Sequence, residues 1–304
     1  MTSGRPTVRF ASPMKRIYAS LDRSGAPGDV LRGAQLALEA RGGAELVVLD
    51  EPDPHRAAQD PDALAYLGEF RSAHVRHTAE VLGEAGLLQV APVATWIGLG
   101  GPTLVRLMPH DGVLARGIAR WMAAAPIRRV LVVHDHDDEY GIPVGEMCAE
   151  AARAAGIETG VRPIWDHDDE IELDGADALL YAGIAGSGAT GLWRALHARD
   201  PRLWLLGTDG VAAAWLARDM SEGAAERTRF FGAQRAPWGF YGYEAMALIL
   251  DSLRDDRAST LEAARSTQSR DSILGRYSID ADGLTTTDEV GVLGVAGGEL
   301  IWAG

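Results

Sequence analysis

Residues 66–99 read YLGEFRSAHVRHTAEVLGEAGLLQVAPVATWIGL. The stretch begins inside an apolar run over Ala63–Leu67, which predicts a strand. A helical pattern follows near His74–Glu84, and a second apolar run covers Leu88–Val90. Strands that alternate with helices predict βαβ units and a parallel sheet. Right-handed crossovers in such a sheet place the loops, and any ligand, at the carboxyl edge of the strands.

The same alternation extends in both directions along the chain. Further strands are predicted at Arg16–Ser20, Glu45–Leu49, Val130–Val133, Ala178–Ala182 and Leu203–Leu206, and further helices near Asp29–Ala40, Pro143–Ala155 and Gly191–Ala198. The connection over residues 50–62 contains three prolines and has room for one or two helical turns around His55–Gln59. After about residue 270, period-2 stretches split by Asp-Gly and Gly-Gly predict antiparallel hairpins.

Composition excludes several classes of function. The 304 residues are 47% hydrophobic and 24% charged, which is ordinary for globular proteins. A net charge of −14 argues against nucleic acid and anionic membranes as partners, because both require basic patches. The sequence has no apolar run of about 18 residues, so we expect no membrane insertion. Its basic N-terminus also lacks the apolar segment of a secretory signal.

A single cysteine, Cys148, rules out an internal disulfide bond. It lies in the alanine-rich helical stretch GEMCAEAARAAG, and we expect it to act as a small buried hydrophobic residue.

The stretch at 66–99 resembles the first-lobe core of Leu/Ile/Val receptors of the type I periplasmic-binding-protein superfamily. In that family a Gly-acidic-x-x-Ser turn is followed by a helix carrying "neAGi" and by a Ser-Pro-Ala-x-Thr turn. Other stretches agree in the same order, and they cover nearly the whole chain: GAQLALE at 33–39, LVRLMPHDGVLARGIARWM at 104–122, RRVLVVHDHDDEYG at 128–141, ALLYAG at 178–183, LWLLGTDG at 203–210, then FYGYEAMALILDSLR and GRYSIDADGLTTTDEVGVLGVAGGEL.

The resemblance implies an α/β protein with two doubly wound parallel-sheet lobes, joined by crossing hinge strands and ending in a β-hairpin. Residues 1–108 and 237–283 would form lobe 1, and residues 109–236 and 284–304 would form lobe 2. The implied function is non-catalytic capture of a small amino-acid-like ligand by hinge closure, for an ABC permease. A divergent sensing module with a regulatory partner is the alternative. The family is extracytoplasmic, and no cofactor or metal is implied.

The resemblance also assigns ligand-binding residues one by one. Ser72, at the start of a helix, would bind the ligand carboxylate, unless it is a simple N-cap. Thr95 matches the hydroxyl of the second turn, where Val93 and Ala94 offer backbone groups. Across the cleft, Asp209 matches the acid that binds the ammonium group.

Three more residues complete the predicted ligand-binding set. Tyr140 matches a tyrosine that closes over the solute, and Tyr18, at the end of the first strand, is expected to line the cleft. Ile184 stands where relatives often have an aromatic residue. Two departures from the family pattern weigh on specificity: the aromatic contact at Ile184 is absent, and Ala91-Pro92 replaces the usual Ser-Pro.

Two rival chemistries have local support in the sequence. The acidic-histidine runs HDHDDE at 134–139 and DHDDEIE at 166–172 invite a metal site, but solvated loops are the preferred interpretation. The segment Gly186-Ser-Gly188-Ala-Thr-Gly191 matches G-x-G-x-x-G between a strand and a helix, with Asp209 in a position to bind a ribose. An NAD-dependent oxidoreductase is therefore kept as a minor alternative, although no catalytic acid, base or nucleophile accompanies the motif.

Overall fold

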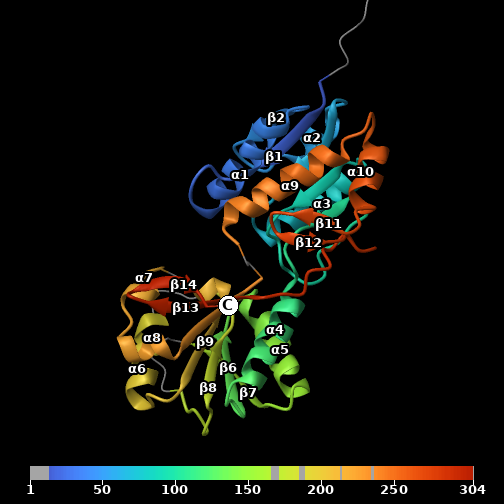
Figure 1. Cartoon of the computed structure of the whole chain (residues 1–304). Helices are drawn as coiled ribbons and strands as arrows, with labels where there is room; N and C mark the ends of the chain where they lie inside the picture. The colour runs from blue at the N-terminus through green and yellow to red at the C-terminus, as the bar shows by residue number, and fades with distance from the viewer. Residues whose placement is uncertain (1–13, 166–170, 185–188, 213, 234–235, 304) are drawn as a thin grey trace, which may run out of the picture.

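A computed structural model describes residues 14–165, 171–184, 189–212, 214–233 and 236–303. Figure 1 shows two separate α/β bodies, one above the other. The chain passes between them after β5, before α9 and after β12. In the described part of the chain, no helix is both long and apolar enough to span a bilayer.

The upper body contains a five-stranded sheet in the order β2-β1-β3-β4-β5, with every pair parallel. Its strands are β1 (Arg16–Ser20), β2 (Glu45–Leu49), β3 (Ala63–Leu67), β4 (Leu88–Ala91) and β5 (Leu104–Arg106). Its helices are α1 (Gly25–Arg41), α2 (Pro54–Gln59), α3 (Ser72–Glu84), α9 (Trp238–Ser252) and α10 (Arg257–Arg265). All residues of β3, β4 and β5 are buried. This is expected for β3 and β4, which are inner strands of the sheet covered on both faces. The edge strand β5 is covered by the segment around Leu284, which bridges to Arg106.

The lower body contains a seven-stranded sheet in the order β14-β13-β10-β9-β8-β6-β7, parallel except for the last two strands of the chain. Its strands are β6 (Arg129–Asp135), β7 (Glu158–Ile164), β8 (Ala178–Tyr181), β9 (Trp204–Thr208), β10 (Thr228–Gly232), β13 (Gly291–Ala296) and β14 (Glu299–Trp302). Its helices are α4 (Asp111–Ala124), α5 (Gly141–Ala154), α6 (Ala189–Arg199), α7 (Ala214–Arg218) and α8 (Glu222–Glu226), with a 3-10 turn, η1, at Asp209–Val211.

Each sheet has an apolar core on both faces, which confirms the predicted doubly wound α/β fold. The C-terminal hairpin is also confirmed, because Gly297 and Gly298 join β13 to β14. A second, two-stranded sheet pairs β11 (Arg270–Ser272) with β12 (Gly275–Tyr277). The predicted helical turns around His55–Gln59 correspond to α2, where the Asp53 side chain accepts from the Arg56 N–H at 3.0 Å.

Helix α9 follows β10 of the second sheet in sequence but packs on α1 of the upper body (Figure 1). The two helices approach closely because glycines lie at their contact. A Cβ atom at Gly33 would lie 1.9 Å from the Gly239 carbonyl oxygen, and one at Gly242 would lie 1.8 Å from the Val30 oxygen. Only glycine leaves room for this backbone-to-backbone packing.

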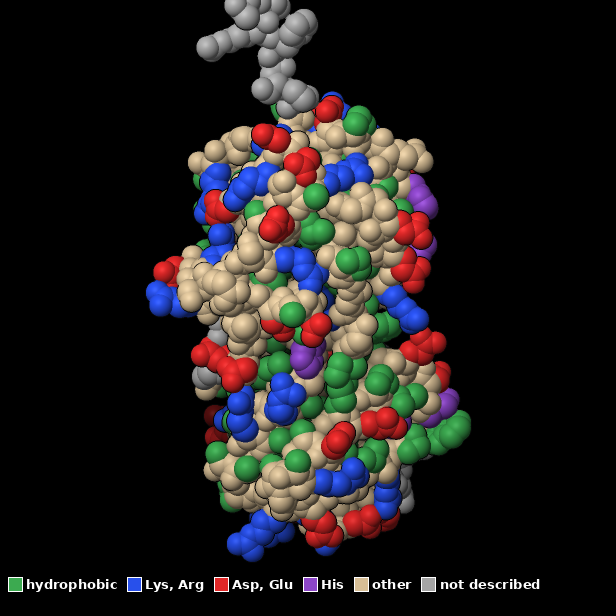
Figure 2. Space-filling model, turned by 90° about the vertical axis from the view of Figure 1, so that its right-hand side faces the viewer, with side chains coloured by type: hydrophobic (Ala, Val, Ile, Leu, Met, Phe, Trp, Pro, Cys, Tyr) green, Lys and Arg blue, Asp and Glu red, His purple; other side chains and the backbone are tan. Residues whose placement is uncertain are grey.

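Two of the connections between the bodies run side by side. The Arg106 N–H donates to the Gly283 oxygen at 2.8 Å, and the Thr285 hydroxyl donates to the Leu107 oxygen at 3.2 Å. Figure 2 shows the surface narrowing between the two bodies, with acidic and basic side chains interspersed on this face. A single-sign patch of the kind that binds nucleic acid is not seen on it.

Candidate functional site

The first half of the candidate site is the pair of loops that follow β3 and β4. Ser72 is the first residue of α3, and Arg71 occupies the N-cap position. The hydroxyl of Ser72 accepts hydrogen bonds from the Thr95 N–H at 3.2 Å and the Trp96 N–H at 3.3 Å. The alternative interpretation of Ser72 as a simple N-cap is therefore wrong, since its hydroxyl ties the two loops together.

A buried arginine holds the loop after β4 in place. Arg106 is 1% exposed, and its guanidinium donates to the carbonyl oxygens of Ala94, Trp96 and Leu99 at 3.2, 2.9 and 2.9 Å. Burial lowers its pKa to about 10. Val93 is buried in the core and Ala94 uses its carbonyl oxygen on Arg106, so both residues shape the turn.

The second half of the site is formed by loops at the carboxyl edge of the lower sheet. These loops meet through glycines. A Cβ at Gly141 would lie 2.8 Å from the Ala182 oxygen, one at Gly183 would lie 2.9 Å from the Gly141 Cα, and one at Gly210 would lie 2.2 Å from the Gly183 oxygen. The loops after β6, β8 and β9 are thereby held in backbone contact, with Tyr140 and Asp209 beside the glycines.

Asp111, at the start of α4, connects the two halves. Its N–H donates to the Thr95 oxygen at 2.9 Å, and its carboxylate accepts from the Tyr140 hydroxyl at 3.2 Å. Asp111 is only 1% exposed. Burial, and then the nearby charge of Asp209, raise its pKa to about 7, while hydrogen bonds from Thr95 and Tyr140 act in the opposite direction.

Asp209 completes this cluster. Its carboxylate accepts from the Gly210 N–H at 3.0 Å, and desolvation raises its pKa to about 6 against that hydrogen bond. Its charge, after burial, also raises the pKa of Tyr140 well above the usual value. Both carboxyl groups are held against ionisation, Asp111 partly by the charge of Asp209, and a bound cation would stabilise their charged forms.

The structure therefore brings together Ser72, Thr95, Tyr140 and Asp209, four of the predicted residues, around an acid that the sequence argument did not select. We refer to these four residues and Asp111 as the interlobe cluster. Asp111 could have been recognised from sequence only as an acid in the first turn of a predicted helix, which is a common structural feature.

Two predicted residues lie elsewhere. Ile184 is 61% exposed, and its N–H donates to the Asp138 carboxylate at 3.1 Å, beside the lower loops. Tyr18 is 5% exposed, packs against Leu49 and Tyr66, and donates its hydroxyl to Asp60 at 2.9 Å. Asp60 precedes β3, so the Tyr18 hydroxyl points toward the amino edge of the sheet. Its expected cleft-lining role is not supported, because alternation along β1 turns the side chain into the core.

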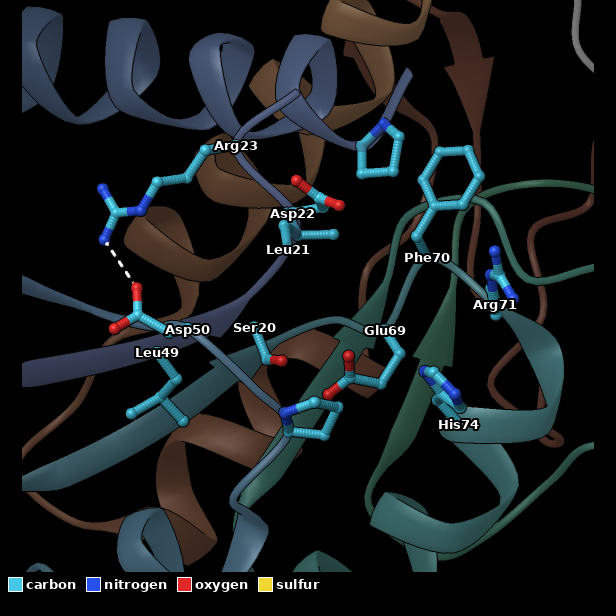
Figure 3. A pocket seen from close by; sticks show the side chains of 12 residues that line it. Ser20, Leu21, Asp22, Arg23, Leu49, Asp50, Glu69, Phe70, Arg71 and His74 are labelled. Atoms are coloured by element: carbon cyan, nitrogen blue, oxygen red, sulfur yellow. Dashed lines mark hydrogen bonds and ion pairs between the residues drawn. The ribbon is translucent and has the colours of Figure 1, made fainter. Parts of the chain in front are cut away.

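An open cavity of about 440 Å³ lies at the carboxyl edge of β1, β2 and β3, and Arg71 and His74 at the start of α3 line it. Figure 3 shows Arg71 and His74 on one side, the Arg23–Asp50 ion pair on the other, and Glu69 between them. Glu69 is 3% exposed and accepts from the Tyr66 hydroxyl at 2.6 Å. Burial raises its pKa to about 7, against hydrogen bonds from Tyr66 and Ser20. No motif in the sequence pointed to this cavity.

Known protein structures share this architecture. No family model and no curated protein matches the sequence. Solved structures do match the fold over nearly its whole length. An ABC transporter substrate-binding protein from Desulfitobacterium hafniense has a TM-score of 0.79 at 18% identity, covering 95% of this chain and 99% of that one.

Two further solved structures agree. A leucine-binding protein from Thermotoga maritima has a TM-score of 0.76 at 21% identity, covering 96% of this chain and 98% of that one. The chain has the type I periplasmic-binding-protein fold. A branched-chain amino acid transporter substrate-binding protein from Streptococcus pneumoniae, solved with isoleucine, has a TM-score of 0.72 at 17% identity and 95% and 99% coverage. The likeness establishes this fold and leaves the ligand of the present chain open.

The structure gives less support to the metal site and the dinucleotide-binding motif than to the interlobe cluster. Among the described residues, no group of three His, Cys, Asp or Glu side chains could hold a metal ion. His136 stacks on Trp165 with ring centroids 4.1 Å apart, and residues 166–170 lie outside the described residues. Gly186 and Gly188 of the glycine-rich motif also lie outside them, while Gly191 is in α6.

Proposed function

We propose that this chain is a non-catalytic solute-binding protein that captures a small amino-acid-like ligand between two lobes. One observation carries the proposal: loops from both bodies meet at Asp111, which bonds to Thr95 on one side and to Tyr140 on the other. The proposed lobe boundaries are those expected from the sequence, residues 1–108 with 237–283 and residues 109–236 with 284–304.

The chemistry of the interlobe cluster supports this assignment. Asp209 and Asp111 offer carboxylates to a ligand ammonium group, and the Ser72 hydroxyl, which accepts from two backbone N–H groups, keeps its own proton to donate to a ligand carboxylate. Charge-assisted hydrogen bonds in a closing cleft provide micromolar affinity, which corresponds to about −8 kcal/mol. By likeness to the solved substrate-binding proteins, the partner is an ABC permease; a regulatory partner is the alternative.

Titration calorimetry with the twenty amino acids tests the proposal. At about 100 times its dissociation constant, a bound ligand adds roughly 2.7 kcal/mol of stability, so a thermal-shift screen identifies candidates first. We expect one class of amino acid to bind, and Asp209→Asn and Thr95→Ala each to remove that binding. Asp219→Asn is the matched control, since Asp219 is an exposed acid of the lower body.

The same titration includes NAD and NADP as competing ligands. Stabilisation by a nucleotide alone would replace the proposal with the dehydrogenase alternative. Unchanged amino-acid affinity in both variants would show that the ligand lies elsewhere. Small-angle scattering with and without the ligand then measures closure, because hinge motion around a solute reduces the radius of gyration.

A further inference from the structure

Charged side chains line the cavity at the carboxyl edge of the upper sheet. Some of them have hydrogen-bond or ion-pair partners and others do not. On one side, Arg23 pairs with Asp50 at 3.2 Å. The Asp22 carboxylate accepts from the Ser24 N–H and hydroxyl, each at 3.0 Å. Glu69 accepts from the Tyr66 hydroxyl. The acidic groups of the cavity therefore already have donors.

Two basic side chains on the opposite wall are different. Within the described part of the chain, neither Arg71 nor His74 has a side-chain hydrogen bond or ion pair, and both are exposed. Figure 3 shows both at the same side of the cavity, close to Phe70. Arg71 offers only donors, and its guanidinium matches a carboxylate geometrically, while the His74 ring offers at least one N–H donor.

The wall of the cavity and the interlobe cluster are joined through the start of α3. Arg71 directly precedes Ser72, and consecutive Cα atoms lie about 3.8 Å apart. Glu69, at the base of the cavity, has a pKa raised to about 7 by burial, so near neutral pH it is able to donate a proton to an oxygen of a bound group. We infer that a solute held at Ser72 and Thr95 extends its distal end toward Arg71 and His74.

We propose that this cavity is a subsite for a second carboxylate of the ligand, bound by Arg71 and His74. The solute class is then a dicarboxylic amino acid and not a branched aliphatic one. This inference rests on the proposed function, since it takes the ammonium group to lie at Asp209 and Asp111. Phe70, Leu21 and Leu49 on the cavity wall would cover the methylenes between the two ends.

Calorimetric titration of the full chain with L-leucine, L-glutamate and L-2-aminoadipate tests the subsite. We expect at least one dicarboxylic amino acid to bind tenfold or more tightly than leucine. Arg71→Gln and His74→Gln should each weaken that binding about tenfold and leave leucine binding within twofold. Arg76→Gln is the matched control, because Arg76 is an exposed arginine on the same helix that does not line this cavity.

The outcomes separate the two proposals. Leucine binding as tight as that of both dicarboxylic amino acids, lost in Asp209→Asn, would overturn the subsite and leave the proposed function standing. Equal binding of dicarboxylic ligands to wild type and Arg71→Gln would also overturn the subsite. Absence of binding by any amino acid would overturn both.

Discussion

The carboxyl group of Asp111 gives the most direct test of the electrostatics of the interlobe cluster. Its pKa rises from 3.8 to about 7 in the folded protein. Between these two pH values the folded state binds more protons than the unfolded state, so wild-type stability falls as pH rises through this window. Three pKa units correspond to about 4 kcal/mol, an upper bound because Asp209 titrates nearby.

Asp111→Asn removes the free-energy cost of ionising this buried carboxyl group. The asparagine oxygen still accepts from Tyr140, but its amide brings donors into a nearly closed site, at a cost of about 1–2 kcal/mol. We therefore expect the variant to be more stable than wild type by about 2 kcal/mol at pH 8, and less stable by about 1–2 kcal/mol at pH 4. Its ligand affinity should fall, since one of the two carboxylates is gone.

Urea unfolding followed by tryptophan fluorescence at pH 4, 6 and 8 measures these differences. Glu146→Gln serves as the control, because Glu146 is exposed on α5 and its substitution should change stability by less than about 0.5 kcal/mol at every pH. If the gap between Asp111→Asn and wild type is the same at pH 4 and pH 8, the carboxyl group is not held against ionisation and the argument fails.

Two other perturbations examine the packing. Gly242→Ala places a Cβ 1.8 Å from the Val30 oxygen and should cost about 2–3 kcal/mol in urea unfolding, whereas Gly191→Ala, which meets nothing within 4 Å, should be neutral; equal effects would contradict the close α1–α9 contact. The Cys148 thiol is 1% exposed and burial raises its pKa to about 12, so a thiol reagent should modify it only in denaturant, and rapid labelling of the native protein would refute its burial.

Sequence periodicity was sufficient for most of the fold. The predicted strands Arg16–Ser20, Glu45–Leu49 and Ala63–Leu67 agree with β1, β2 and β3 to the residue, because each is a short apolar run between clear turn signals. Strand β7 was missed, since its alternating exposure at the sheet edge leaves few apolar residues in GVRPI. Strand β5 was missed as a separate element because it has only three residues.

The site was predicted in part. The resemblance named Ser72, Thr95, Tyr140 and Asp209, and the structure has them around one buried acid; their role in binding stays a prediction. Asp111 and Arg106 were not selected, because a lone acid at a helix start and a lone basic residue in a short apolar stretch have common structural explanations. Tyr18 was misplaced, since the direction of a strand side chain depends on which layer covers each face.

The packing of α9 on α1 has a consequence for folding during translation. About 200 residues separate the end of the first helix from the start of the second. At a translation rate of roughly 5–20 residues per second, α9 is synthesised on the order of 10–40 s after α1, and the apolar face of α1 stays uncovered for that time. The upper body therefore cannot complete its packing until α9 has been synthesised. Until then the apolar face of α1 is accessible to a nascent-chain chaperone.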